Sequence, residues 1–186
     1  MRIVAGAWRG RRLTAPLGVA TRPTADRVRQ ALFDMLLHAP WGGRHAVAGG
    51  AVLDAFAGTG ALGLEALSRG AAHATFLERD RAALAALRAN IGSCGAASRA
   101  RVIEADATRP PLPPPPGTPC TLVFLDPPYG QGLAERALPA LKEAGWLAPA
   151  ALLVIESARD EAATSPGTAL AERAHGAACL RVFRLD

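Results

Sequence analysis

The chain of 186 residues lacks any uninterrupted apolar run of the roughly 20 residues that a membrane-spanning helix needs. It also lacks the apolar core of a secretory signal peptide near its start, where glycine and arginine interrupt the sequence Met-Arg-Ile-Val-Ala-Gly-Ala-Trp-Arg. We therefore expect neither a membrane span nor a signal peptide.

Cysteine is scarce, with only Cys94, Cys120 and Cys179, and no two of them form a C-x-x-C pair. The odd number and the wide spacing argue against a disulfide framework and against a zinc site. We expect a reduced, cytoplasmic protein without a bound metal, in which the cysteines fill apolar space.

Lysine is almost absent, because Lys142 is the only lysine among 21 Lys and Arg residues. The net charge of +5 can arise from composition alone, so the position of the arginines is more informative. Residues 1–30 contain seven arginines and a single acid, Asp26. A basic cluster of this density predicts contact with nucleic acid. The candidate side chains are Arg9, Arg11, Arg12, Arg22, Arg27 and Arg29.

The first 37 residues are expected to form a basic arm followed by a helix. In the arm, residues 1–20, Trp8 could stack on a base or anchor the arm to the core, and the sequence leaves both open. Residues 21–37 predict a helix with Thr24 as its N-cap, because apolar residues recur at helical spacing. That apolar face consists of Val28, Ala31, Leu32, Met35 and Leu36.

From residue 51 onward, strand and helix patterns alternate. The expected strands span 51–55, 75–78, 101–105, 121–125 and 151–156, and the expected helices span 61–69, 81–91 and 133–143. The proline-rich residues 109–119 indicate a stiff surface connection, and residues 168–186 indicate a closing hairpin. We therefore expect one α/β domain over residues 1–186, with a mostly parallel central sheet flanked by helices and a C-terminal antiparallel hairpin. Its core would be residues 51–186.

The stretch from Val52 to Gly63 indicates a strand, a tight turn and a helix. Gly58, Gly60 and Gly63 allow a ligand to approach the backbone closely, and the start of the helix presents N–H groups to it. The three glycines also satisfy G-x-G-x-x-G, which by itself would fit a nicotinamide-dependent dehydrogenase. We predict a site for a nucleotide-like ligand at residues 54–63.

Each of the first four expected strands carries an acid at or near its carboxyl end, namely Asp54, Glu78, Asp106 and Asp126. Glu78 follows Gly58 by twenty residues, where a dinucleotide-binding fold places an acid against ribose hydroxyls. Asp106 could accept a hydrogen bond from an adenine amino group. Any one of these acids could be a turn or cap residue, but four beside a glycine turn predict a site for an adenosine-containing ligand.

The tetrapeptide Asp126-Pro127-Pro128-Tyr129 follows an apolar strand. Its prolines remove two N–H donors and leave carbonyls free to accept. Asp126 and the Pro127 carbonyl could therefore accept both N–H bonds of an exocyclic amine and aim its lone pair at an electrophile, while the base stacks on Tyr129. A structural Asp-Pro turn is the alternative. We predict that these four residues are catalytic.

Together these motifs resemble S-adenosylmethionine-dependent methyltransferases that act on exocyclic amino nitrogens. Over nearly the whole chain, the sequence is similar to the bacterial 16S ribosomal RNA guanine-N2 methyltransferases. The similarity departs at Ala5 and Ala25, where the family would have Gly and Thr. The segments that carry it are residues 2–11, 22–33, 53–71, 126–130 and 155–157.

The resemblance implies a Rossmann-like class I methyltransferase, active as a monomer, on ribosomal RNA or on a small-subunit assembly particle. Six residues would hold the cofactor: Asp54, Gly58 and Gly60 at its methionine part, Glu78 at the ribose, Asp106 at the adenine, and Phe56 as a further contact. A DNA adenine-N6 methyltransferase, a dehydrogenase and a non-catalytic RNA-binding protein remain alternatives.

Overall fold

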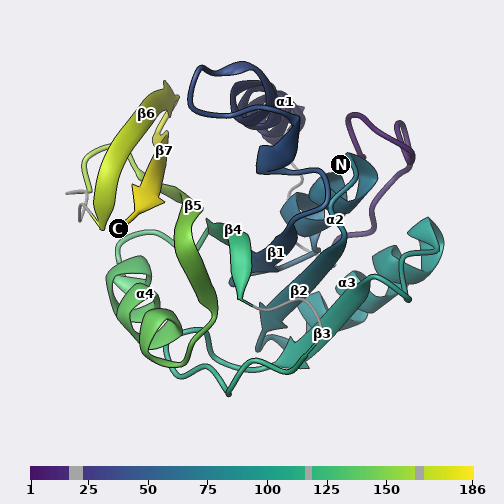
Figure 1. The fold of residues 1–186 in the computed structure, drawn as a ribbon. Coiled ribbons are helices and arrows are strands. Elements are labelled where there is room, and N and C mark those ends of the chain that lie inside the picture. The colour runs from purple at the N-terminus through teal and green to yellow at the C-terminus, as the bar shows by residue number, and fades with distance from the viewer. Residues whose placement is uncertain (17–22, 116–118, 162–165) are drawn as a thin grey trace.

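A computed structural model describes residues 1–16, 23–115, 119–161 and 166–186, and it shows one sheet covered by helices on both faces (Figure 1). The helices are α1 (Pro23–His38), η1 (Arg44–Ala46, 3-10), α2 (Ala61–Ser68), α3 (Arg81–Cys94) and α4 (Leu133–Glu143). The strands are β1 (Ala51–Asp54), β2 (His73–Glu78), β3 (Ala100–Glu104), β4 (Cys120–Leu125), β5 (Leu147–Ala158), β6 (Gly167–His175) and β7 (Ala178–Leu185). Over these residues, none of the helices is both long and apolar enough to span a membrane.

The seven strands follow the order β3-β2-β1-β4-β5-β7-β6. The first five in this order run parallel, whereas β7 is antiparallel to both β5 and β6. The predicted mostly parallel sheet with a C-terminal hairpin is therefore confirmed. The strand order reverses between β1 and β4, and in such sheets a ligand crevice opens at the carboxyl ends of these strands. Asp54 and Asp126 stand at this position.

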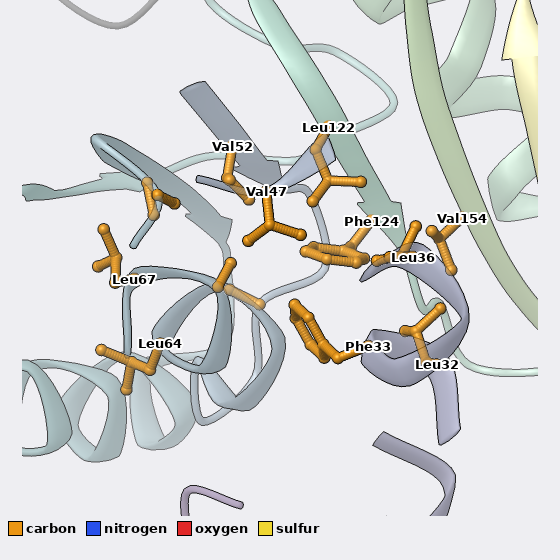
Figure 2. Close-up of a cluster of buried hydrophobic side chains, with 14 of the residues drawn as sticks. Leu32, Phe33, Leu36, Val47, Val52, Leu64, Leu67, Leu122, Phe124 and Val154 are labelled. Carbon is orange, nitrogen blue, oxygen red and sulfur yellow. The ribbon is translucent and has the colours of Figure 1, made fainter. Parts of the chain in front are cut away.

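Alternate side chains of the central strands pack into two cores, because successive side chains of a strand point to opposite faces. In β1, for example, Val52 contributes to a larger core with α1, α2 and α3, whereas Leu53 contributes to a smaller core with α4. Figure 2 shows the larger core, in which the ring centroids of Phe33 and Phe124 lie 5.8 Å apart. Helix α1 is held to the sheet by a face that differs in part from the prediction, because Leu32 and Leu36 are buried as expected, Phe33 is buried in addition, and Ala31 is exposed.

The start of α1 differs from the prediction. The helix begins at Pro23, so Thr24 lies inside it and is not its N-cap residue. Proline suits this first helical position, because the missing N–H has no partner there in any helix. The predicted segment at residues 21–22, and with it Arg22, falls outside the described residues.

Residues 1–16 do not extend as an arm but fold back on themselves beside α2 and α3 (Figure 1). A single antiparallel bridge joins Arg2 and Arg12. Ile3 and Leu13 are buried in the larger core. Burial of these side chains fixes the segment to the domain.

Glu65 of α2 is the main polar anchor of this segment and is fully buried. Its carboxylate accepts hydrogen bonds from the backbone N–H groups of Val4 (2.7 Å) and Ala5 (2.9 Å). It also forms ion pairs with Arg29 (3.4 Å) and Arg69 (2.8 Å). Arg29 is only 3% exposed and its guanidinium is used inside the protein, which leaves it little access to a nucleic-acid phosphate.

Trp8 also anchors the N-terminal segment, which decides between the two alternatives left by the sequence. Its indole packs against the larger core, and the guanidinium carbon of Arg99 lies 5.2 Å from its ring centroid. Its backbone N–H donates to the Ser68 hydroxyl at 3.0 Å. Nearby, Gly6 has a φ of +82°, and a Cβ there would lie 2.0 Å from the Ser68 carbonyl oxygen. Close backbone contact with α2 therefore requires glycine at this position.

The proline-rich connection before β4 lies along the surface, as predicted, and is fixed at two points. The indole N–H of Trp146 donates to the Pro111 carbonyl at 2.8 Å. The Arg101 guanidinium donates to the carbonyls of Pro114 (3.0 Å) and Pro115 (2.9 Å). Residues 116–118 lie outside the described part of the chain. The three cysteines are buried, as expected of apolar fillers.

Candidate active site

The turn after β1 is closed by two carboxylates at strand ends. The Asp54 side chain accepts a hydrogen bond from the Gly63 N–H at 2.9 Å, which ties β1 to the start of α2. The Glu78 side chain accepts one from the Gly58 N–H at 2.7 Å, which ties the same turn to β2. Both acids therefore shape the glycine turn in addition to any role toward a ligand.

The three glycines of the turn are required for different reasons. Gly58 has a φ of +53°, and a Cβ there would meet nothing within 4 Å, so this residue faces open space. A Cβ on Gly60 would lie 2.4 Å from Leu87 Cδ1, and one on Gly63 would lie 2.3 Å from Phe76 Cε1. Gly60 is buried and lines neither cavity described below, so the structure shows a packing role for it, and the cofactor contact stays a prediction.

Replacing Gly63 with alanine should lower the free energy of unfolding by about 1–3 kcal/mol, because the added methyl overpacks the contact with Phe76. Denaturant titration would measure this change. Gly92→Ala in α3 is the matched control, since its Cβ would enter open space and alanine favours a helix. Equal stability of the Gly63 variant and the wild type would contradict the packing role.

A cavity of about 620 Å³ opens at the carboxyl ends of β1 to β4. It brings together most of the predicted cofactor residues with the whole predicted catalytic tetrapeptide. The predicted residues that line it are Phe56, Gly58, Glu78, Asp106, Asp126, Pro127, Pro128 and Tyr129. This larger cavity is the candidate cofactor site.

Arg79 is a wall residue of this cavity that the sequence interpretation missed. Its guanidinium donates to Asp106 at 2.9 Å, across the tips of β2 and β3. Hydrogen bonds from the Thr108 backbone and hydroxyl, together with Arg79, hold the pKa of Asp106 below its usual range. The Glu78 carboxylate accepts from the backbone N–H groups of Arg79 (2.7 Å) and Asp80 (2.8 Å). Both acids are therefore held in fixed orientations at the cavity edge.

Asp54 is 1% exposed and stands at the end of β1. Burial raises the pKa of its carboxyl from 3.8 to about 7, although the hydrogen bond from Gly63 lowers it and the charge of Glu78 raises it further. The carboxyl is therefore close to half protonated at neutral pH. A cationic group placed beside it would favour the ionised form.

Because of Asp54, the free energy of unfolding should fall by up to about 4 kcal/mol as the pH rises from about 4 to about 7. In this window the folded state holds the Asp54 proton and the unfolded state has lost it, so raising the pH favours unfolding. Urea unfolding at several pH values would measure the slope. In Asp54→Asn this part of the slope should disappear, and an identical slope in both proteins would contradict the assignment.

A second cavity, of about 440 Å³, adjoins the first. Phe56, Gly58, Asp126 and Tyr129 line both cavities, so the two ends of the predicted catalytic tetrapeptide stand between them. Further wall residues come from α1, from the end of β1, from β5 and from the β6–β7 hairpin, and they include Leu32, Asp54, Glu156, His175 and Leu180. This smaller cavity is the candidate site for the substrate.

Glu156, at the end of β5, is a second residue without a predicted role. The Tyr129 hydroxyl donates to its carboxylate at 2.7 Å, which fixes the aromatic ring at the mouth of the cavities. The following loop is held by Glu161, which accepts from the Gly130 N–H at 2.7 Å. The signal was present in the sequence, because Glu156 closes the expected strand 151–156, just as the four predicted acids lie at or near the ends of the first four expected strands.

The pKa of Asp126 is raised well above its usual range, first by desolvation among the surrounding atoms and then by the negative charges of Glu156 and Asp54. Solvent still reaches the residue from the open side of the cavity, which limits the size of this effect. The direction means that the Asp126 carboxyl holds a proton more tightly than an ordinary aspartate. Near the reacting atoms, such a group is suited to accept a proton.

The predicted nucleic-acid contacts separate into two groups. Arg9, Arg11, Arg12 and Arg27 are exposed, and the Arg11 guanidinium donates to the Ser93 carbonyl at the end of α3. These four remain candidates, in contrast to the buried Arg29. Within the described ranges, no three His, Cys, Asp or Glu side chains are grouped so that they could hold a metal ion.

Comparison with known proteins gives consistent matches. Residues 1–184 match the model of the family described as Conserved hypothetical protein 95. Ribosomal RNA small subunit methyltransferase D of Escherichia coli K12 is 45% identical over 157 residues, which cover 84% of this chain and 74% of that protein. The protein of the same name from Haemophilus influenzae is 37% identical over 187 residues, which cover 99% of this chain and 93% of that protein.

Solved structures agree with these matches. A putative methyltransferase, yhhF, from Escherichia coli has a TM-score of 0.82 and 39% identity, with 100% of this chain and 98% of that chain covered. An RNA methyltransferase from Salinibacter ruber, in complex with S-adenosyl-L-homocysteine, has a TM-score of 0.66 and 15% identity, with 90% and 94% covered. The second similarity shows the fold alone, which is that of a class I methyltransferase. The chain therefore belongs to the Conserved hypothetical protein 95 family, together with the ribosomal RNA small subunit methyltransferases D.

Proposed function

We propose that this protein transfers a methyl group from S-adenosylmethionine to the exocyclic N2 amine of a guanine in small-subunit ribosomal RNA. The names of its relatives support the coarser part, methylation of small-subunit ribosomal RNA. The finer part depends on one observation: Asp126 and Tyr129 line both a second cavity and a cavity rich in strand-end acids, and Pro127 lines the latter. The proposal implies a cytoplasmic location.

The residues of the larger cavity fit S-adenosylmethionine. The Glu78 carboxylate has acceptor sites beyond its three backbone hydrogen bonds and would hold the ribose hydroxyls. Asp106 would share its outer oxygen between Arg79 and the adenine amino group. Gly58, which lines both cavities, and Asp54, which lines the adjoining smaller cavity, would hold the methionine part, where the ammonium would favour ionised Asp54. When bound, the cofactor supplies an electrophilic methyl group.

In the smaller cavity, the target amine would be held by the tetrapeptide. Asp126 and the Pro127 carbonyl would accept its two N–H bonds, and the base would stack on Tyr129. The amine lone pair would then point at the methyl group, so that positioning provides much of the rate acceleration. A guanine must leave its own base stack to reach this cavity. Ionised Asp126 would accept the proton that the amine loses.

The exposed arginines of the N-terminal region would contact the RNA backbone. Phosphate contacts fix the position of a protein on a nucleic acid, whereas base contacts select the site. Arg9, Arg11, Arg12 and Arg27 are the exposed candidates, and they lie on a segment that is packed onto α2 and α3 or on α1. Because the segment is fixed, these charges would meet the RNA without a large cost of ordering.

Arg9→Ala should lower the slope of log affinity against log salt concentration by about 0.7, if Arg9 neutralises one phosphate of single-stranded RNA. Filter binding of ribosomal RNA over a salt series would measure the slope. Arg136→Ala, an exposed residue of α4 on the other face of the sheet, should leave it unchanged. An unchanged slope for Arg9→Ala would place Arg9 outside the RNA interface.

Isothermal titration tests the cofactor. S-adenosylmethionine should bind with one site per chain, and NAD should not bind. Gly58→Ala should weaken that binding, because a methyl group would enter the open space that Gly58 presents to the cavity. Binding of NAD without binding of S-adenosylmethionine would overturn the proposal in favour of a dehydrogenase.

A further inference from the structure

We propose that Glu156 and His175 make the smaller cavity selective for guanine. In this arrangement the Glu156 carboxylate accepts a hydrogen bond from guanine N1–H, and the His175 Nε2–H donates to guanine O6. The inference depends on the proposed function, because it concerns the base whose N2 amine Asp126 would hold.

The sheet places these three side chains in a fixed order. Asp126 follows β4, Glu156 lies in β5, and His175 ends β6 at the hairpin with β7. Their strands are neighbours in the order β4-β5-β7-β6, and Glu156 pairs with Leu180 of β7 while His175 pairs with Ala178. Asp126, Glu156 and His175 all line the smaller cavity. They therefore form one row along its wall.

Glu156 has acceptor capacity beyond its contact with Tyr129. One carboxylate oxygen accepts from the Tyr129 hydroxyl at 2.7 Å, and an ionised carboxylate offers about four lone-pair sites. A hydrogen bond from guanine N1–H to this group would be charge-assisted and hence strong. Adenine carries a lone pair at N1 instead of a proton. The same carboxylate would repel it, so Glu156 would both favour guanine and reject adenine.

His175 supplies the second, independent observation. Its Nε2 atom is buried and has no hydrogen-bond partner among the described residues. A buried polar nitrogen without a partner is costly, so a ligand that provides one gains affinity. The side chain lines the smaller cavity, and a neutral imidazole with its proton on Nε2 is a donor. Guanine O6 is an acceptor of the required kind.

The row of groups matches the edge of guanine in order. Along that edge guanine presents the N2 amine, the N1–H and the O6 acceptor. Opposite it the wall presents an acceptor at Asp126, an acceptor at Glu156 and a donor at His175. The base 2-aminopurine keeps the N2 amine but lacks both the N1 proton and O6. Comparing guanine with 2-aminopurine therefore separates recognition of N1–H and O6 from the reaction at the N2 amine.

The experiment compares methylation of two RNA substrates that differ at the target nucleotide, one with guanine and one with 2-aminopurine. The wild type should prefer guanine by about 10- to 100-fold in kcat/KM. Glu156→Ala should lose about this factor on guanine and far less on 2-aminopurine, so that the preference collapses. Glu104→Ala is the matched control, because Glu104 is exposed at the end of β3 and lines neither cavity.

Tyr129→Phe tests whether Glu156 recognises the base directly or only positions Tyr129. It keeps the ring but removes the hydroxyl that Glu156 accepts, so it should slow both substrates alike and preserve the guanine preference. His175→Phe should reduce methylation of guanine and leave 2-aminopurine unaffected. If Glu156→Ala keeps the wild-type preference, Glu156 acts only through Tyr129 and the inference fails. If His175→Phe loses equal activity on both substrates, His175 does not take part in the recognition of guanine.

Product analysis distinguishes failure of this inference from failure of the proposed function. If the wild type forms N2-methylguanosine but Glu156→Ala retains the preference for guanine, only the inference is overturned. If the wild type forms no N2-methylguanosine, the proposed function and the inference are overturned together.

Discussion

Replacing Asp126 with alanine should nearly abolish methyl transfer while leaving S-adenosylmethionine binding almost unchanged. The substitution removes one of the two acceptors that would hold the target amine, together with the group that would take its proton. We expect a loss of about 10²- to 10³-fold in kcat, the size usually found when a preorganised hydrogen-bonding group at a reacting centre is removed. Single-turnover transfer of tritiated methyl groups to RNA measures the rate, and calorimetry measures cofactor binding.

Glu104→Ala provides the control for this variant as well, since it removes a strand-end acid that lines neither cavity. It should keep the wild-type rate. An Asp126→Ala enzyme with near wild-type kcat would refute the role of Asp126 in holding the amine. A variant that no longer binds S-adenosylmethionine would instead assign Asp126 to the cofactor site.

Glu65→Ala should lower the free energy of unfolding by about 3–5 kcal/mol, because it leaves buried guanidinium groups without their counter-charge. Arg29 and Arg69 are 3% and 6% exposed at the side chain, so water cannot readily replace the carboxylate. The N–H groups of Val4 and Ala5 lose their acceptor in the same step. Guanidinium chloride unfolding measures the total effect.

Hydrogen exchange locates where that stability is lost. In Glu65→Ala, the amides of Val4 and Ala5 should exchange faster than those of the central strands, because the N-terminal segment loses its polar anchor. Glu143→Ala, an exposed residue in the last turn of α4, should change neither measurement. Unchanged protection of Val4 and Ala5 in Glu65→Ala would show that burial of Ile3 and Leu13 alone holds the segment.

Much of the fold could be predicted from local sequence patterns. Strand and helix periodicities identified the parallel core and the closing hairpin, because each element buries a face whose spacing is visible in the sequence. The strand-end acids Glu78, Asp106 and Asp126 could be grouped for a related reason. Parallel strands end at the same edge of a sheet, so residues distant in sequence meet there without further information.

Contacts between elements could not be predicted in this way. Arg29 resembled its exposed neighbours in sequence, and only its pairing with Glu65, 36 residues later, shows that it is buried. The packing role of Gly60 depends on Leu87 of another helix. His175 gave no signal in the sequence, because its significance comes from a buried nitrogen without a hydrogen-bond partner among the described residues and from a cavity that several distant elements build. Long-range packing leaves no periodic signal near these residues.

The most direct test of the central claim is nucleoside analysis after incubation with tritiated S-adenosylmethionine. The protein would be given unmodified small-subunit ribosomal RNA, partly assembled small subunits and DNA in parallel. The account predicts label in N2-methylguanosine from the ribosomal RNA or from the particle, and none from DNA. Label in N6-methyl-2′-deoxyadenosine from DNA, or in another nucleoside of the RNA, would contradict it.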